Sequence, residues 1–237
     1  MAPLQQFSVR NRLLKVLAAN DFALLQPHLE AFDLPLQQEL ITPNAPVKHL
    51  YFIECGVGSI TADGADGRVE VGIVGCEGLV GAVPVLLCSD RTPHHHFMQI
   101  AGDALRISTE TLSTAVDASP SLRRLLLRYV QTEIIQVRQT AYVNATYNLE
   151  PRLARWLLMC HDRVVGDDLR LKHEFMSMML GVGRPGVTLA LQNLEGAGRI
   201  RNTRGRVQVL SRELLEVLAD GSYGQPEAEY ARLIEGA

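Results

Sequence analysis

Arginine is unusually concentrated in one short stretch of this sequence. The stretch 196–212 contains no acidic residue and five arginines, which are Arg199, Arg201, Arg204, Arg206 and Arg212. Guanidinium groups form charge-assisted, bidentate hydrogen bonds with phosphates. Because the whole chain has a formal net charge of only −3, this is a local basic patch on a near-neutral protein. Such a pattern indicates a chain that binds a polyanion at one place.

The residues before the patch have the spacing of two short helices. One helix is predicted over 172–180, with Phe175, Met176 and Met179 facing inward. Gly181 suits a tight turn, and Pro185 suits the first turn of a second helix that ends near 196. Residues 199–201 and 206–209 flank the turn sequence 202–205 and predict a β-hairpin. Together these elements form a winged helix-turn-helix.

This arrangement assigns roles to individual side chains. A second helix can enter a DNA major groove about 12 Å wide, while the first helix and the hairpin, or wing, contact phosphates. We expect phosphate contacts from Lys172, His173, Arg201, Arg204 and Arg206. We expect base contacts from Arg184, Thr188 and Gln192, with Gly186 allowing the helix start to approach the DNA backbone closely. The alternative is a helical subdomain with a solvated charged face.

The first half of the chain has a different character. Helical spacing over 8–32, with Asp21 as an expected helix cap, gives way to short apolar runs at 36–41, 49–62, 69–74 and 97–108. Asp-Gly steps at 63–64 and 66–67 are hairpin signals. Short strands separated by such turns predict an antiparallel β-roll of the jelly-roll type with flanking helices. The overall expectation is an α+β fold.

A long helix is predicted to join the two halves. Ser119 and Pro120 are a cap and a first helical residue, and the helix should end near Thr146. Apolar residues follow at spacings of three and four, which indicates a seam for pairing with a second copy; they are Leu127, Val130, Ile134, Val137 and Ala141. The alternative is a helix that packs only on its own domain. Asn148 is the expected cap of the next helix, which should extend to about Val165.

The order of sensor roll, long helix and winged helix-turn-helix resembles the Crp/Fnr family of bacterial transcription regulators. The stretch Gly181-Val182-Gly183-Arg184-Pro185-Gly186-Val187 occupies the position of the family's Gly-Cys-Ser-Arg-Glu-Thr-Val, and Leu194-Glu195 and Arg199-Ile200 also match. Residues 148–154 resemble the start of the family's first DNA-domain helix. The resemblance implies that Arg184 reads guanine. Pro185 and Leu189 replace a Glu and an Arg of the family pattern, which predicts a different operator sequence.

The sensor departs from the family pattern as well. Members that bind cyclic AMP hold its phosphate with a Gly-Glu and an Arg-Ser pair, whereas this chain has Gly81-Ala82 and then His94-His95-His96. Arg91 is the nearest arginine, at a different offset. An unmatched phosphate loses a charge-assisted hydrogen bond of about 1.5–3 kcal/mol. We therefore predict that cyclic AMP does not control the protein, and the effector is unknown.

The three histidines also allow a metal-binding interpretation. On a strand, His94 and His96 would share one face, as in the HxH pair of cupin metalloenzymes, but no carboxylate or further histidine follows nearby. A cupin-like metal-binding protein or enzyme is the alternative function. The four cysteines are far apart, without a CxxC pair, and are read as reduced packing residues. We expect no bound metal, no cofactor and no enzymatic activity.

These observations divide the chain into a cyclic-nucleotide-binding-like roll (1–118), a dimerisation helix and hinge (119–147) and a DNA-binding domain (148–237). The predicted function is a cytoplasmic, homodimeric transcription regulator that binds an inverted-repeat operator in double-stranded DNA. RNA polymerase is a further candidate partner. No signal peptide or membrane span is expected from the apolar pattern.

Overall fold

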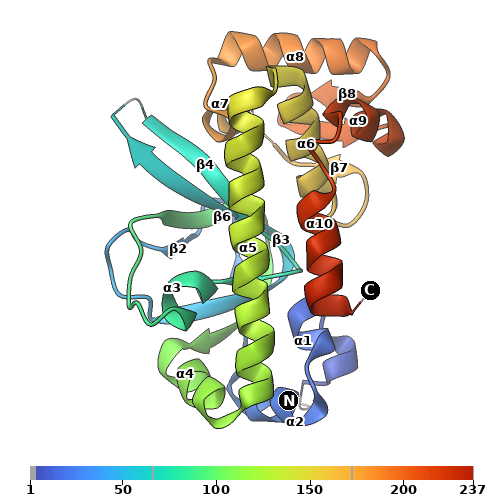
Figure 1. Ribbon diagram of the computed structural model, residues 1–237. Helices are drawn as coiled ribbons and strands as arrows, with labels where there is room; N and C mark the ends of the chain where they lie inside the picture. The colour runs from blue at the N-terminus through green and yellow to red at the C-terminus, as the bar shows by residue number, and fades with distance from the viewer. Residues whose placement is uncertain (1–3, 66, 172, 237) are drawn as a thin grey trace.

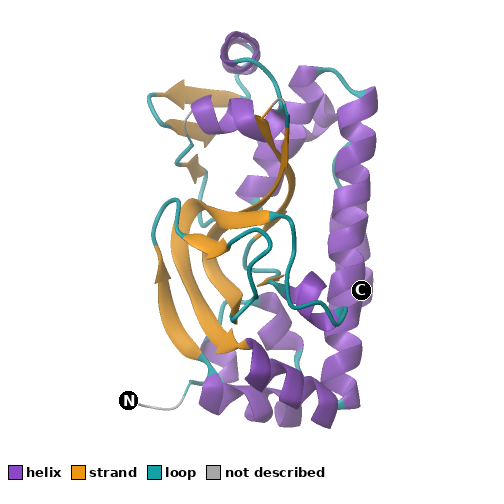
Figure 2. Ribbon diagram, turned by 90° about the vertical axis from the view of Figure 1, so that its left-hand side faces the viewer, coloured by secondary structure: helices purple, strands orange, loops and turns teal. Residues whose placement is uncertain are grey.

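The computed structural model describes residues 4–65, 67–171 and 173–236, without the side chains of residues 173 and 174. It has the expected α+β architecture: an N-terminal antiparallel sheet with short flanking helices, one long helix, and a C-terminal helix-turn-helix (Figure 1). Figure 2 shows the sheet on one side of the molecule and the long helix running along the other.

The roll is one sheet in which β1 (Glu30–Leu34), β6 (His95–Ser108), β3 (His49–Gly64) and β4 (Gly67–Val74) are neighbours in that order. Strand β2 (Glu39–Ile41) pairs with β6, and β5 (Leu79–Val80) pairs with β3. All these pairings are antiparallel. Register shifts interrupt the pairing of the two longest strands, β3 and β6. Such irregularities bend and twist strands, which lets the long sheet curve around an apolar interior.

Short helices cover one end of the roll. They are α1 (Arg12–Val16), α2 (Ala19–Leu25), α3 (Ala82–Leu86) and α4 (Thr109–Ala118), with short 3-10 turns at Gln6–Ser8 and Gln26–His28. The predicted helical spacing over 8–32 extends too far, because α2 ends at Leu25, the 3-10 turn ends at His28, and β1, which pairs with β6, begins at Glu30. Asp21 is not the cap of α2. It lies inside that helix, buried, and accepts a 2.5 Å hydrogen bond from Ser119 Oγ.

The long helix α5 (Pro120–Thr146) begins and ends where its sequence predicts. The Ser119 hydroxyl accepts a hydrogen bond from Leu122 N, and Pro120 occupies the first turn. After Asn148, helix α6 (Leu149–His161) stops four residues earlier than expected. The turn lets Arg163 reach back to Glu77 of the roll, with Nε 2.8 Å from Oε1.

The C-terminal part contains β7 (Asp168–Leu169), α7 (His173–Leu180), α8 (Arg184–Gly196), β8 (Ile200–Thr203), β9 (Arg206–Val209), α9 (Arg212–Ala219) and α10 (Gln225–Tyr230), then a π-helical turn (Ala231–Glu235). Strands β7, β9 and β8 form an antiparallel sheet in that order. The hairpin was predicted, whereas the two-residue strand β7 was not. Its pairing with β9 depends on contacts between residues about forty positions apart.

One apolar core crosses between the roll and the C-terminal domain. Val57, Ile73, Phe97 and Ile100 of the roll belong to the same buried cluster as the helices of the C-terminal domain. Phe97 and Phe175 approach with ring centroids 6.4 Å apart. A continuous core holds the orientation of two packed units, since separating them would expose apolar surface to water. The connection at 147–148, between α5 and α6, therefore joins units that are docked together.

Candidate nucleic-acid interface

Helices α7 and α8 form the predicted helix-turn-helix. Gly181 has a φ of +62°, a left-handed conformation that glycine adopts without strain. Gly183 caps α8, and Pro185 lies in its first turn. The inner face of α8 packs on the domain core through Val187, Ala190, Leu191 and Leu194. The sequence thus builds the turn with glycine and fixes the helix by its apolar face.

The outer face of α8 is open to solvent. This helix lies across one end of the molecule in Figure 1 and is seen end-on at the top of Figure 2. Arg184, Leu189 and Gln192 are exposed on it. Thr188 is half-buried, and its hydroxyl donates a hydrogen bond to Arg184 O at 3.0 Å. Three of the side chains expected to contact bases therefore come from one helix, at positions where an entering DNA groove could reach them.

Gly186 occupies a different environment from the one expected. A side chain there would point toward α6, where Leu149 Cδ2 would lie 3.4 Å from an added Cβ. The small residue therefore allows α8 to pack closely on α6. This is a packing role within the domain, and the expected close approach of the helix start to a DNA backbone stays a prediction.

The wing is the hairpin formed by β8 and β9. Gly205, with a φ of +76°, makes the turn at its tip. Arg201 and Arg204 are exposed on this hairpin. Arg206 is also exposed, but its Nε donates to Asp168 Oδ1 at 2.7 Å. Two of the three expected wing arginines thus extend into solvent, and the third is held on β7 by an ion pair.

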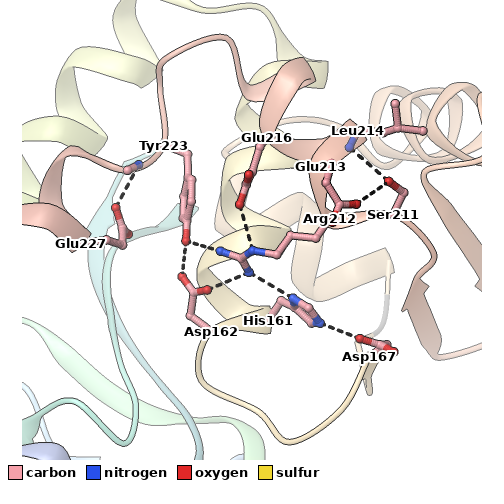
Figure 3. A network of polar contacts seen from close by, with 11 residues as sticks. His161, Asp162, Asp167, Ser211, Arg212, Glu213, Leu214, Glu216, Tyr223 and Glu227 are labelled. Atoms are coloured by element: carbon pink, nitrogen blue, oxygen red, sulfur yellow. Dashed lines mark hydrogen bonds and ion pairs between the residues drawn. The ribbon is translucent and has the colours of Figure 1, made fainter.

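The other two arginines of the basic stretch belong to the domain's internal structure. Figure 3 shows Arg212 at the centre of a polar network between α6 and α9. Its guanidinium lies 2.8 Å from an oxygen of Asp162 and 2.9 Å from one of Glu216, and it donates to the Tyr223 hydroxyl. Arg199 donates to Leu214 O at 3.3 Å. Only the i,i+4 spacing of Arg212 and Glu216 signals this network in the sequence.

The side chains of two expected phosphate ligands lie outside the part of the chain that the structure describes. Lys172 is not described, and for His173 only the backbone, at the start of α7, is described.

The expected dimer seam on α5 is divided between two environments. Leu127 and Val137 are 40% and 36% exposed, and Ala141 is also exposed. Val130 is 3% exposed and belongs to the core of its own roll. Ile134 is partly buried and packs against the same core. The exposed part of the seam remains open to a second copy, while Val130 already fulfils the alternative role of packing on its own domain.

A buried carboxyl group lies where the C-terminal domain docks on the roll. Glu70 of β4 accepts a 2.7 Å hydrogen bond from Trp156 Nε1 of α6, and its other oxygen is 2.6 Å from Ser59 Oγ. Burial raises the pKa of Glu70 to about 8. The carboxyl is therefore predominantly neutral at pH 7, and its hydrogen bonds join the two domains. No sequence pattern indicated this contact.

The end of the chain returns to the roll. Helix α10 and the turn after it pack beside α5 and α1 (Figure 1). Tyr230 donates to Glu77 O at 2.7 Å, Arg12 stacks over the Tyr230 ring, and Arg12 and Glu235 form an ion pair at 2.6 Å. The stretch 225–235 therefore leaves the expected DNA-binding domain and packs against α1, α5 and the roll.

The position that holds a cyclic phosphate in the resembled family is apolar here. Gly81 precedes α3, and Ala82 is buried in its first turn. An added Cβ at Gly81 would lie 3.4 Å from side-chain atoms of Ile41, Val47 and Leu50. Arg91 lies in an exposed loop and is paired with Asp90 at 2.8 Å. The described side chains around α3 thus offer apolar contacts to this position.

The three histidines have separate surroundings. His95 Nε2 is 2.9 Å from Glu39 Oε2, and its other nitrogen is 2.9 Å from Arg68. His96 is buried, which lowers its pKa to about 3. Among the described residues, no group of three or more His, Cys, Asp or Glu side chains is arranged to hold a metal ion. Nor is any described helix both long and apolar enough to span a membrane.

The geometry defines a class: an antiparallel β-roll joined by a long helix to a winged helix-turn-helix. The sequence model of the Crp-like helix-turn-helix domain matches residues 151–218. No curated protein matches the chain in sequence.

Several solved structures share this architecture. FixK2 from Bradyrhizobium japonicum superposes with a TM-score of 0.69 at 17% identity, covering 80% of this chain and 96% of that one. A CRP-family transcriptional regulator from Thermus thermophilus gives 0.66 at 18% identity, covering 82% and 98%. CLP from Xanthomonas campestris, a global regulator responsive to c-di-GMP, gives 0.62 at 20% identity, covering 82% and 100%. The sequence match assigns residues 151–218 to a Crp-like helix-turn-helix domain, and the solved structures share the fold of the chain.

Proposed function

We propose that this chain is a transcription regulator of the Crp/Fnr type that binds an inverted-repeat operator in duplex DNA as a homodimer, without cyclic AMP. The observation that carries the proposal is the open outer face of α8 beside the exposed Arg201 and Arg204 of the wing. A helix of this kind fits the major groove, and arginines beside it neutralise phosphates. Chromosomal DNA lies in the bacterial cytoplasm, which is therefore the expected compartment. We further propose that the chain is not an enzyme.

Selection from a random duplex pool at physiological salt, with no added ligand, tests DNA binding. We expect the purified chain to enrich an inverted repeat and Arg184→Ala to lose that enrichment. Arg232→Ala is the matched control, because Arg232 is exposed, is paired with Glu229 at 2.7 Å and belongs to the C-terminal arm. Failure of the wild-type chain to enrich any duplex contradicts the proposal.

Exposed apolar residues on α5 support the homodimer. Leu127, Val137 and Ala141 lie on the exposed part of the helix, and pairing of two such helices would hold two copies of α8 about one DNA turn, roughly 34 Å, apart. We expect Leu127→Glu with Val137→Glu to convert the dimer to a monomer in sedimentation. Phe7→Glu, at another exposed apolar residue, serves as the control. A monomeric wild-type chain at working concentration refutes this part.

The apolar surroundings of Gly81 and Ala82 support independence from cyclic AMP. A bound phosphate would lie against buried aliphatic groups without a charged partner, which is unfavourable. Isothermal titration of cyclic AMP into the chain should give no saturable heat, and the enrichment above should not change when the nucleotide is added. A micromolar dissociation constant would overturn the interpretation.

A further inference from the structure

Leu189 is the large apolar side chain that α8 presents to solvent. It is 59% exposed, whereas the buried face of the helix is already filled by Val187, Ala190, Leu191 and Leu194. At about 100° per residue, Leu189 lies about 160° around the helix from both Val187 and Leu191. Its side chain therefore points away from the domain core and contributes nothing to it.

The neighbours of Leu189 place it at the outermost edge of the helix. Pro185 lies one turn before it and Gln192 one turn after it, and both are exposed. On the adjacent wing, Arg201 and Arg204 carry the charge that attracts a DNA backbone. A helix docked with these arginines on phosphates inserts its outermost edge into the groove. Leu189 is then among the side chains closest to the base edges.

A leucine cannot form hydrogen bonds with a base, so only an apolar group can be its partner. The edges of the four base pairs in the major groove carry donors and acceptors, and the one methyl group among them is the C5 methyl of thymine. Packing the isobutyl group of leucine on a polar edge would desolvate donors and acceptors without replacing their hydrogen bonds. The chemistry of the position therefore favours thymine.

We propose that Leu189 selects a thymine in each operator half-site by contact with its C5 methyl group. The inference rests on the DNA-binding function proposed above and specifies part of the sequence that is bound. A rise of 1.5 Å per residue puts Leu189 about 7.5 Å along the helix from Arg184. The selected thymine should thus lie about two base pairs from the base that Arg184 contacts, since base pairs are about 3.4 Å apart.

Replacing thymine by deoxyuridine tests this contact without altering base pairing. Deoxyuridine keeps the O4 acceptor and loses only the methyl group. With the selected operator, each thymine is replaced in turn, symmetrically in both half-sites, and the dissociation constant is measured for the full-length chain. Burial of one methyl group corresponds to about a fourfold change in affinity, and two half-sites to about fifteenfold.

The expected result is one thymine position at which the wild-type chain loses about fifteenfold and Leu189→Ala loses less than twofold. Leu189 is exposed, so the variant should fold; unchanged thermal unfolding checks this. Leu214→Ala, at an exposed leucine of α9, should retain the full wild-type loss. If every thymine can be replaced without loss, or if Leu189→Ala keeps the loss, the leucine contact is wrong while DNA binding stands. If no duplex is selected at all, both proposals fall.

Discussion

Substitution of Glu70 by glutamine should make the protein more stable in alkali than the wild type. Glu70 lies between the roll and the C-terminal domain, with Trp156 Nε1 at 2.7 Å and Ser59 Oγ at 2.6 Å. The neutral carboxyl can donate to Ser59 Oγ, whose own hydrogen can turn to Met179 Sδ at 3.4 Å. Glutamine reproduces this pattern, since its amide donates to Ser59 and its carbonyl accepts from Trp156.

The sign and size of the effect follow from the pKa. Burial raises the pKa of Glu70 from an ordinary value of 4.5 to about 8. Because the pKa of this carboxyl is higher in the folded protein, its protonated form contributes to the free energy of unfolding. The contribution is complete below about pH 4.5 and is lost progressively as the pH rises to about 8. The full difference corresponds to about 5 kcal/mol. Separation of the two domains, which lets water reach the ionised group, would reduce the observed loss to a few kcal/mol.

Trp156 provides the assay, because it is the only tryptophan in the chain and it contacts Glu70 directly. Urea unfolding followed by its fluorescence should give similar unfolding free energies for wild type and Glu70→Gln at pH 5. At pH 8.5 the variant should be more stable by about 2–4 kcal/mol. Glu110→Gln, at an exposed position, should follow the wild type throughout. Equal losses of stability for wild type and Glu70→Gln between pH 5 and 8.5 would refute the reasoning.

Four further substitutions test other parts of the structure. Arg204→Ala should lower the slope of log affinity for DNA against log salt by about 1, measured as binding isotherms over a salt series. Leu157→Ala, at a fully buried residue of the C-terminal core, should lower the unfolding free energy by about 2–5 kcal/mol in urea. Gly181→Ala should cost about 1–2 kcal/mol in the same assay, because a Cβ disfavours the φ of +62°. Arg212→Ala removes partners from Asp162, Glu216 and Tyr223 and should lower the thermal midpoint, with a loss of about 1–2 kcal/mol.

The sequence predicted those parts of the fold that local residues specify. Ser119 and Pro120 start α5, and Gly181 makes the turn between α7 and α8; each acts within a few residues of its own position. Strand β1 and the docking of Trp156 on Glu70 were not predicted. These features depend on partners about seventy or more residues away, and pairing at that distance leaves no periodic pattern.

At the candidate interface, too, the sequence predicted what depends on local residues and missed contacts with distant ones. The exposed Arg201 and Arg204 could be assigned from the sequence because exposure at a hairpin is the default for arginine. Arg206 is tied to Asp168 across the small sheet, and Arg212 to Asp162 on α6. Both aspartates precede the helix-turn-helix in the sequence. The stretch 196–212 contains no acidic residue, but in the folded protein these two arginines lie beside carboxylates from elsewhere in the chain. Local composition overestimated the number of arginines that are open to solvent.

The docking of the two domains affects how the proposed regulator fits an operator. Because one apolar core includes Phe97 of the roll and Phe175 of α7, the direction of α8 relative to α5 is set by this core as well as by the connection at 147–148. If α5 pairs with its copy as proposed, the distance between two recognition helices is then determined by packing between rigid units. A change that loosens the Glu70 contact would leave the outer face of α8 intact but widen the range of half-site spacings that the dimer accepts. The ratio of affinity for an operator with one base pair added or removed at the centre to affinity for the perfect repeat should therefore be higher for Glu70→Lys than for the wild type. An unchanged ratio would show that the α5 pairing alone sets the spacing.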